Sequence, residues 1–199
     1  MSAHVAVLFA RADSNYKQLP GVDVYDEARD ARTFTGRVPV VAHPPCRSWG
    51  RLRALANPLP HERDLAIFAV AQVRANGGVL EHPARSTLWA AAGLPVPGER
   101  DAWNGWTLPI VQRDFGHRAD KPTWLYIVGV ELDALPPLPL ALGHATHVVG
   151  RSGRNRDGSR LRKGDAAWRP EVSKAEREHT PPLLAAWLVR VAQEATHAR

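Results

Sequence analysis

Apolar residues along this chain fall into short runs, and two of these runs frame a segment with helical spacing. The runs 4–10 and 38–42 combine β-branched and other apolar residues, which predicts buried strands. From Pro60 to Asn76 the apolar residues recur at helical spacing, and the two glycines that follow predict the end of a helix. The apolar pair 79–80 predicts the next strand. Strand, helix and strand form a βαβ unit, so the two strands should lie parallel.

The second half of the chain predicts a different kind of strand pairing. Residues 86–92 are a short helix candidate, and the runs 107–111 and 123–130 predict an antiparallel hairpin. Near the end, Thr180 is expected to cap a final helix that has Pro181 at its first position. Together these elements predict an α/β fold with a Rossmann-like, mostly parallel sheet and an antiparallel hairpin.

Length and composition bound the architecture and the compartment. A chain of 199 residues with 44% hydrophobic and 23% charged residues predicts one globular domain over 1–199. No apolar run is long enough for a transmembrane helix, and the first residues lack the basic start of a signal peptide. The single cysteine, Cys46, excludes an internal disulfide and indicates a reducing, cytoplasmic setting.

The positive charge of the chain is concentrated in one segment. The chain carries a net charge of +6, and residues 148–170 alone carry +5 among glycines and serines. This composition predicts a basic flexible loop that contacts nucleic acid, and the alternative is an ordinary solvated surface loop. The residues expected to contact nucleic acid are Arg151, Arg154, Arg156, Arg160, Arg162 and Lys163.

Two candidate catalytic residues follow the predicted parallel strands, where open α/β sheets place their sites. Cys46 comes after two prolines that end the strand 38–42, and a cysteine there can act as a nucleophile if nearby cations favour its thiolate. Glu81 follows the strand 79–80, and burial at a sheet edge is expected to raise its pKa until it donates a proton. Arg118 lies on a loop and could clamp an anion or a base. Each residue also has an ordinary structural interpretation, and the spacing of the histidines around Cys46 only weakly indicates a metal, so no metal site is predicted.

Three segments in the same order resemble the cytosine-C5 DNA methyltransferases. VVAHPPCRSWGRLR resembles their Pro-Cys nucleophile loop, VLEHP their Glu-Asn-Val loop with His82 in place of Asn, and FGHRADKPTWLYIVG their FG segment. EREHTPPLLAAWLV is a looser match to their last helix, and the short length resembles phage-borne relatives. The resemblance implies that Cys46 attacks C6 of a cytosine, Glu81 hydrogen-bonds the base, and Arg118 supports the ring or the cysteine loop. A base in duplex DNA has to be flipped out of the stack for this chemistry.

The resemblance also implies S-adenosyl-L-methionine as the methyl donor. The family holds it on a glycine-rich loop after the first strand, whereas this chain has Phe9 there and no glycine before Gly21. The fold is therefore expected to be compact and truncated in its N-terminal, cofactor-binding half. The residues expected at the cofactor are Phe9, Asp23, Asp26, Asp30 and Pro45.

Three functions remain open on this basis. The first is a methyltransferase-like enzyme that modifies a pyrimidine in DNA or in a nucleotide. The second is a catalytically silent, nucleic-acid-binding relative that has lost its cofactor site, and the third is a transferase with a different donor. DNA or a nucleotide is the expected partner, and neither a membrane nor a protein partner is implied.

Overall fold

The computed structural model describes residues 4–50, 53–150 and 152–195, and its centre is one mixed six-stranded sheet. Four neighbouring strands pair in parallel, and the last two strands add antiparallel pairings at one side. The protein therefore has an α/β fold, and the expected parallel neighbours and antiparallel hairpin are both confirmed. The order across the sheet is β2 (Val22–Tyr25), β1 (Val5–Leu8), β3 (Val40–Ala42), β4 (Gly78–Pro83), β6 (Pro122–Val128) and β5 (Trp106–Val111).

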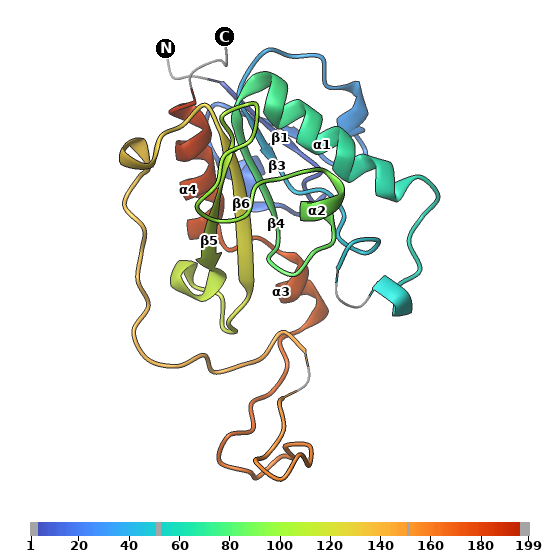
Figure 1. Cartoon of the computed structure of the whole chain (residues 1–199), viewed down its shortest axis with the longest axis vertical. Coiled ribbons are helices and arrows are strands. Elements are labelled where there is room, and N and C mark those ends of the chain that lie inside the picture. The colour runs from blue at the N-terminus through green and yellow to red at the C-terminus, as the bar shows by residue number, and fades with distance from the viewer. Residues whose placement is uncertain (1–3, 51–52, 151, 196–199) are drawn as a thin grey trace.

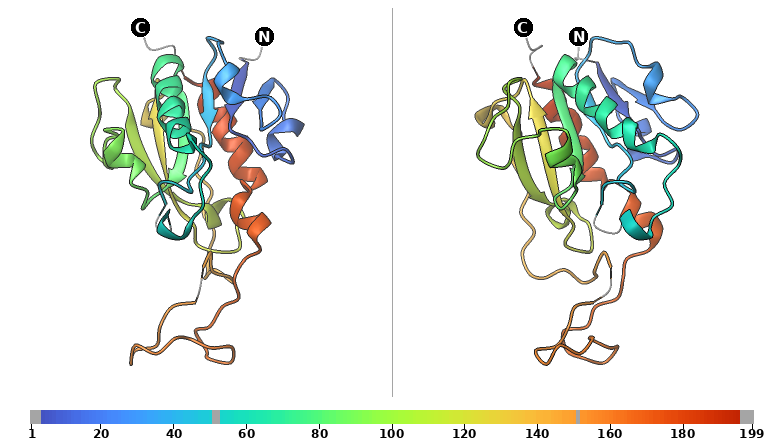
Figure 2. Two further views of the ribbon diagram at one scale, coloured as in Figure 1. Left: turned by 90° about the vertical axis from the view of Figure 1, so that its right-hand side faces the viewer. Right: turned by 45° about the vertical axis from the view of Figure 1, so that its right-hand side comes forward.

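Helices cover both faces of this sheet (Figures 1 and 2). Helix α1 (Glu62–Asn76) connects β3 to β4 and packs on one face, and α4 (Pro182–Gln193) packs on the other. No helix among the described residues is both long and apolar enough to cross a membrane.

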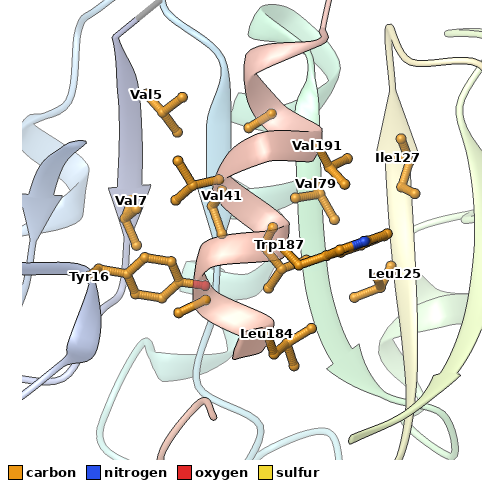
Figure 3. Close-up of a cluster of buried hydrophobic side chains, with 14 of the residues drawn as sticks. Val5, Val7, Tyr16, Val41, Val79, Leu125, Ile127, Leu184, Trp187 and Val191 are labelled. Carbon is orange, nitrogen blue, oxygen red and sulfur yellow. The ribbon is translucent and has the colours of Figure 1, made fainter. Parts of the chain in front are cut away.

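Alternation along the strands divides the core into two clusters, because successive side chains of a strand point to opposite faces. On β1, Val5 and Val7 belong to the cluster beneath α4, and Ala6 and Leu8 belong to the cluster beneath α1. Figure 3 shows the cluster on the α4 side, where Trp187 of the helix lies over the strands. This division decides on which face every later site residue lies.

Helix α1 forms as its apolar spacing predicts, with Ala66, Ala69, Val70 and Val73 buried against the sheet. The helix ends at Asn76, and the chain then turns directly into β4. Gly78 has a φ of +111°, and a Cβ there would collide with the backbone of Val40. A glycine is therefore required for β4 to pair closely with β3.

The connections between the first three strands are short. The β1–β2 connection contains only the 3₁₀ helix η1 (Asn15–Gln18), and the β2–β3 connection contains only η2 (Ala31–Thr33). In the described residues neither crossover has an α-helix, in agreement with the expected shortening of this half of the sheet.

Three boundaries differ from the sequence expectation. Helix α4 begins at Pro182 with Pro181 as its cap, because the Thr180 carbonyl instead accepts a hydrogen bond from Asn15 Nδ2 at 2.9 Å. Strand β4 extends to Pro83, because its last residues pair with β6 after the pairing with β3 has ended. Helix α2 is limited to Leu88–Ala91, and the helix α3 (Lys174–Glu178) was not anticipated.

The basic segment 148–170, called the basic projection below, extends away from the body of the protein (Figure 1). A bridge between Val148 and Glu171 joins its two ends, and Ser152 Oγ hydrogen-bonds the backbone of Arg169. A second, antiparallel bridge pairs Arg154 with Arg160. Arg151, one of the residues expected to contact nucleic acid, lies outside the described residues.

Candidate active site at the carboxyl edge of the sheet

Glu81 and His43 are brought together by the parallel pairing of β4 with β3. The last register pair of β3 with β4 is Ala42 with Leu80, so the residue that follows this pair on each strand lies at the carboxyl edge of the parallel pairing. Both residues continue the alternation of the α4 face, since they follow Val41 and Val79 by two positions. His43 Nδ1 lies 3.1 Å from Glu81 Oε2, and both side chains are nearly buried.

Tyr16 extends this pair into the protein core. It lies in η1, belongs to the cluster beneath α4, and places its hydroxyl 2.7 Å from His43 Nε2. Burial, together with the charge of Glu81, raises the pKa of Tyr16 well above its ordinary value, so the phenol keeps its proton. In the tautomer of His43 that carries its proton on Nδ1, the phenol hydroxyl donates to Nε2 and Nδ1–H donates to Glu81.

Gln112 holds the other oxygen of the carboxylate. It begins the 3₁₀ helix η4 (Gln112–Phe115) directly after β5, and its Nε2 donates to Glu81 Oε1 at 3.0 Å and to Thr123 Oγ1 at 3.1 Å. Tyr16, His43, Glu81, Gln112 and Thr123 thus form one connected chain of hydrogen bonds, called the carboxylate network below. Both oxygens of Glu81 are fixed by it.

The charge state of Glu81 differs from the expectation. Burial raises the pKa of Glu81, but the hydrogen bond from His43 and the positive charge of Lys121 lower it more, to about 2. The expected proton-donating acid is therefore an ionised carboxylate at neutral pH. The expectation of a raised pKa was wrong, because the sequence indicates the burial of the carboxyl group but not the donors that surround it in the fold.

Cys46 lies on the loop that leaves β3 and retains an exposed surface. The main chain turns sharply after it, since the Cys46 carbonyl accepts hydrogen bonds from the amides of Trp49 and Gly50. Desolvation of the sulfur and the negative charge of Glu81 raise the pKa of the Cys46 thiol, whereas Lys121 lowers it. The negative charge of Glu81 therefore disfavours the thiolate form of Cys46.

The arginines beside Cys46 have other partners. Arg47 forms an ion pair at 2.6 Å with Glu62, a buried residue at the start of α1. Arg53 Nη1 lies 3.4 Å from the Gly50 carbonyl, and Arg51 lies outside the described residues. The cation that favours the Cys46 thiolate is Lys121, which the sequence did not single out.

Arg118 pairs with a residue of α3. Its guanidinium forms a two-pronged ion pair with Glu176 and a hydrogen bond with His147. No hydrogen bond in the described parts of the chain joins it to Cys46 or Glu81, so its catalytic role stays a prediction.

The carboxylates expected at the cofactor are already engaged by cations of this chain. Asp26 directly follows β2 and accepts from Lys17 Nζ at 2.6 Å and from two backbone amides. Asp23 pairs with Arg29, and Asp30 pairs with Arg32.

The turn after β1 has no glycine-lined surface. Phe9 adopts the left-handed conformation with φ of 63°, and its ring stands edge-on to Phe68 of α1. Arg11 then pairs with Asp13 and Glu178. Pro45 lies on the cysteine loop, and its carbonyl interacts with His82. These residues do not fit S-adenosylmethionine in the way that the resemblance implies, because a side chain and ion pairs stand where an open backbone loop is needed.

The sequence did not predict the partners that determine the charge state of Glu81. Tyr16 and Gln112 belong to short 3₁₀ helices, and neither has a local pattern that relates it to a distant carboxylate. His43 could have been found, because its spacing of two from Val41 places it on the same face as Glu81 once the strands are known to be parallel.

The described cations of the basic projection have no carboxylate partners within the parts of the chain that the structure describes. Among the described residues, no carboxylate lies within 4.0 Å of the charged groups of Arg154, Arg156, Arg160, Arg162, Lys163 or Arg169. Its own acids are engaged locally, since Asp157 accepts from Ser159 and Asp165 accepts from the Arg162 amide. In residues 4–50, 53–150 and 152–195, eight arginines outside the projection pair with carboxylates, namely Arg11, Arg29, Arg32, Arg47, Arg74, Arg100, Arg113 and Arg118. The projection also leaves the body on the side of the carboxyl edge (Figure 1).

Comparisons of this chain with known proteins found no related protein. No protein-family model matches the chain, and neither a curated protein nor a solved structure shows significant similarity to it.

Proposed function

We propose that this protein is a cytosine-C5 methyltransferase-like enzyme of Rossmann-like fold that activates a cytosine of DNA through a covalent bond to Cys46. The observation that carries the proposal is the placement of the Cys46 loop and Glu81 at the carboxyl edge of two adjacent parallel strands. A thiol nucleophile and a fixed carboxylate at one sheet edge are the two groups that this chemistry needs.

The strand order supports the proposal. Strand β1 lies between β2 and β3, so the chain changes direction across the sheet between β1 and β3. Ligands of open α/β sheets bind outside the carboxyl ends of the strands at such a switch point. His43 follows β3 at this point, and Cys46 comes three residues later.

The chemistry of the two groups is complementary. The Cys46 thiol first gives its proton to solvent. The thiolate then forms a bond to C6, and the electron pair of the C5–C6 double bond moves toward C5 and N3. An electrophile bonds to C5, the proton of C5 leaves to solvent water, and the thiolate departs as the double bond returns. The ionised Glu81 accepts a hydrogen bond from the exocyclic amine and so holds the ring in place.

Deuterium exchange at C5 tests this step without a methyl donor, because a deuteron from solvent can serve as the electrophile. A cytosine-containing oligonucleotide incubated with the protein in D₂O should gain deuterium at C5, as mass spectrometry of the released nucleosides measures. Cys46→Ser should abolish the exchange, and Lys121→Met should slow it because the thiolate loses its favourable cation. Undiminished exchange in Cys46→Ser would refute the proposal.

The unpaired cations of the basic projection support DNA as the substrate, since such groups bind phosphates and release counterions. Replacement of Arg154, Arg156, Arg160 and Arg162 by Ala should weaken DNA binding. The slope of log affinity against log salt should fall by up to about 3 to 4, because each neutralised phosphate contributes about 0.9 to it. The matched control replaces the same residues by Lys and should keep most of the slope. Equal slopes in the wild type and the Ala variant would show that the projection does not bind DNA.

Two observations favour a second candidate, a catalytically silent DNA-binding protein. Phe9 stands where a glycine loop is needed, and the pKa of Cys46 is raised. This alternative predicts salt-dependent DNA binding with no C5 exchange. A transferase with a different donor predicts exchange that S-adenosylmethionine leaves unchanged.

A further inference from the structure

The carboxylate network contains a histidine, His43, that has no role in the proposed steps of Cys46 and Glu81. His43 joins a phenol that keeps its proton to a carboxylate that has lost its own, with 2.7 Å to Tyr16 and 3.1 Å to Glu81. Burial of such a connected polar chain is costly unless its polar atoms are paired, and here both ring nitrogens of His43 and both oxygens of Glu81 have partners. With the proton of His43 on Nδ1 alone, the donors point from Tyr16 through His43 toward Glu81, and a second proton on Nε2 donates to the Tyr16 oxygen instead.

The surroundings leave His43 as the proton-exchanging member of the network. Tyr16 from η1 and Glu81 from β4 contact it directly, and Lys121 and Cys46 lie near Glu81. Helix α4, which covers the same face, carries no charged residue from 182 to 189. Imidazole is the side chain that ordinarily gains or loses a proton between about pH 5 and 8.

The proposed reaction needs a proton at this place. When the Cys46 sulfur adds to C6, electron density moves to N3 of the cytosine, and N3 becomes more basic. A carboxylate without a proton can orient the exocyclic amine but cannot protonate N3. Glu81 therefore needs a neighbour that can supply one.

We propose that His43 is a positioning residue that acts through Glu81 and supplies the proton that N3 takes up during adduct formation. This inference rests on the proposed function. In the step, protonated His43 gives its Nδ1 proton to Glu81 Oε2, and Glu81 passes a proton to N3 as the sulfur bonds to C6. His43 becomes neutral and the adduct carries no added negative charge. Elimination of the thiolate returns the proton by the same route, so no other reactant is consumed.

The test measures the rate of C5 deuterium exchange in His43→Asn. An asparagine amide can take the place of Nδ1–H toward Glu81 but cannot carry a proton to it. The kcat of exchange should fall by about 100-fold, the lower end of what a positioned acid or base contributes, while KM changes by less than about threefold. The matched control, His179→Asn, changes a histidine that pairs with Asp13 and should keep the wild-type kcat and KM.

Two further measurements separate the possible outcomes. If His43→Asn fails to fold, as circular dichroism would show, His43→Gln is measured instead, since its amide can keep the bond to Tyr16. In ¹⁵N NMR spectra the wild-type His43 should be protonated at Nδ1 when neutral, and Glu81→Gln should remove this preference. Unchanged kcat in the His43 variants, with exchange that still requires Cys46, would overturn this inference alone. Absence of exchange in the wild type, or exchange without Cys46, would overturn the proposed function and this inference with it.

Discussion

Protonation of one buried histidine should control the stability of this protein in mild acid. His82 is fully buried on the α1 face of β4, where its ring stands edge-on to Trp89 at 6.4 Å. Burial lowers the pKa of His82 from 6.5 to about 4, although the charge of Glu81 and the carbonyl of Pro45 oppose this effect. The folded protein therefore resists a proton that the unfolded chain accepts readily.

The sign and size of the effect follow from this difference in pKa. Above about pH 6.5 neither state binds the proton, and the stability is fully present. As the pH falls toward 4 only the unfolded state is protonated, so the free energy of unfolding decreases. At about 1.4 kcal/mol for each pH unit, the loss amounts to about 2 kcal/mol at pH 5 and about 3 kcal/mol at pH 4.

Urea unfolding at a series of pH values between about 4 and 7 measures this loss. His82→Asn removes the titrating ring, so the difference in unfolding free energy between wild type and variant should shrink by about 3 kcal/mol from pH 7 to pH 4. His61→Asn is the control, because it removes an exposed histidine and leaves the buried ring of His82 in place. A constant difference between wild type and His82→Asn across this range would refute the reasoning.

Three further changes test other parts of the structure. The lowered pKa of Glu81 contributes about 3 kcal/mol to the free energy of unfolding, and this contribution is present above about pH 4.5 and is lost as the pH falls toward 2. Glu81→Gln should therefore flatten the pH dependence of the unfolding free energy in this range, as urea titrations measure. Gly78→Ala should destabilise the protein by more than about 3 kcal/mol in thermal unfolding, because its Cβ would collide with the backbone of Val40. Gly98 has a similar φ but open space around it, so Gly98→Ala should cost only about 1 kcal/mol. Equal losses would exclude the clash with Val40 as the cause. Leu188→Ala should cost about 2 to 5 kcal/mol, since Leu188 is a fully buried residue of α4 in the cluster between this helix and the sheet, and a loss below about 1 kcal/mol would contradict that packing.

The α/β class could be derived from local patterns. Short apolar runs, the helical spacing of residues 62–76 and the glycines after it are properties of neighbouring residues, and neighbouring residues decide strand, helix and turn. The parallel pairing of β3 with β4 followed from the helix between them, since a helical crossover returns the chain in the same direction. Cys46 and Glu81 could be placed at one edge for the same reason.

The charge of the candidate site could not be derived in this way. Glu81 becomes an ionised carboxylate because His43, Gln112 and Lys121 reach it from different elements, and no local pattern relates these residues. The placement of Phe9 and Arg11 where a cofactor loop was expected also depends on contacts with α1 and with the end of α3.

The sequence alone thus determined where strands and helices form and which residues follow their ends, because backbone preference and hydrophobic periodicity act over a few residues. Only the tertiary structure decided which distant donors surround Glu81, which arginines keep free charge, and what Arg118 binds. The physical reason is that hydrogen bonds and ion pairs act over a few ångströms in space. Partners 38 residues apart, as His43 and Glu81 are, become neighbours only when the sheet has formed.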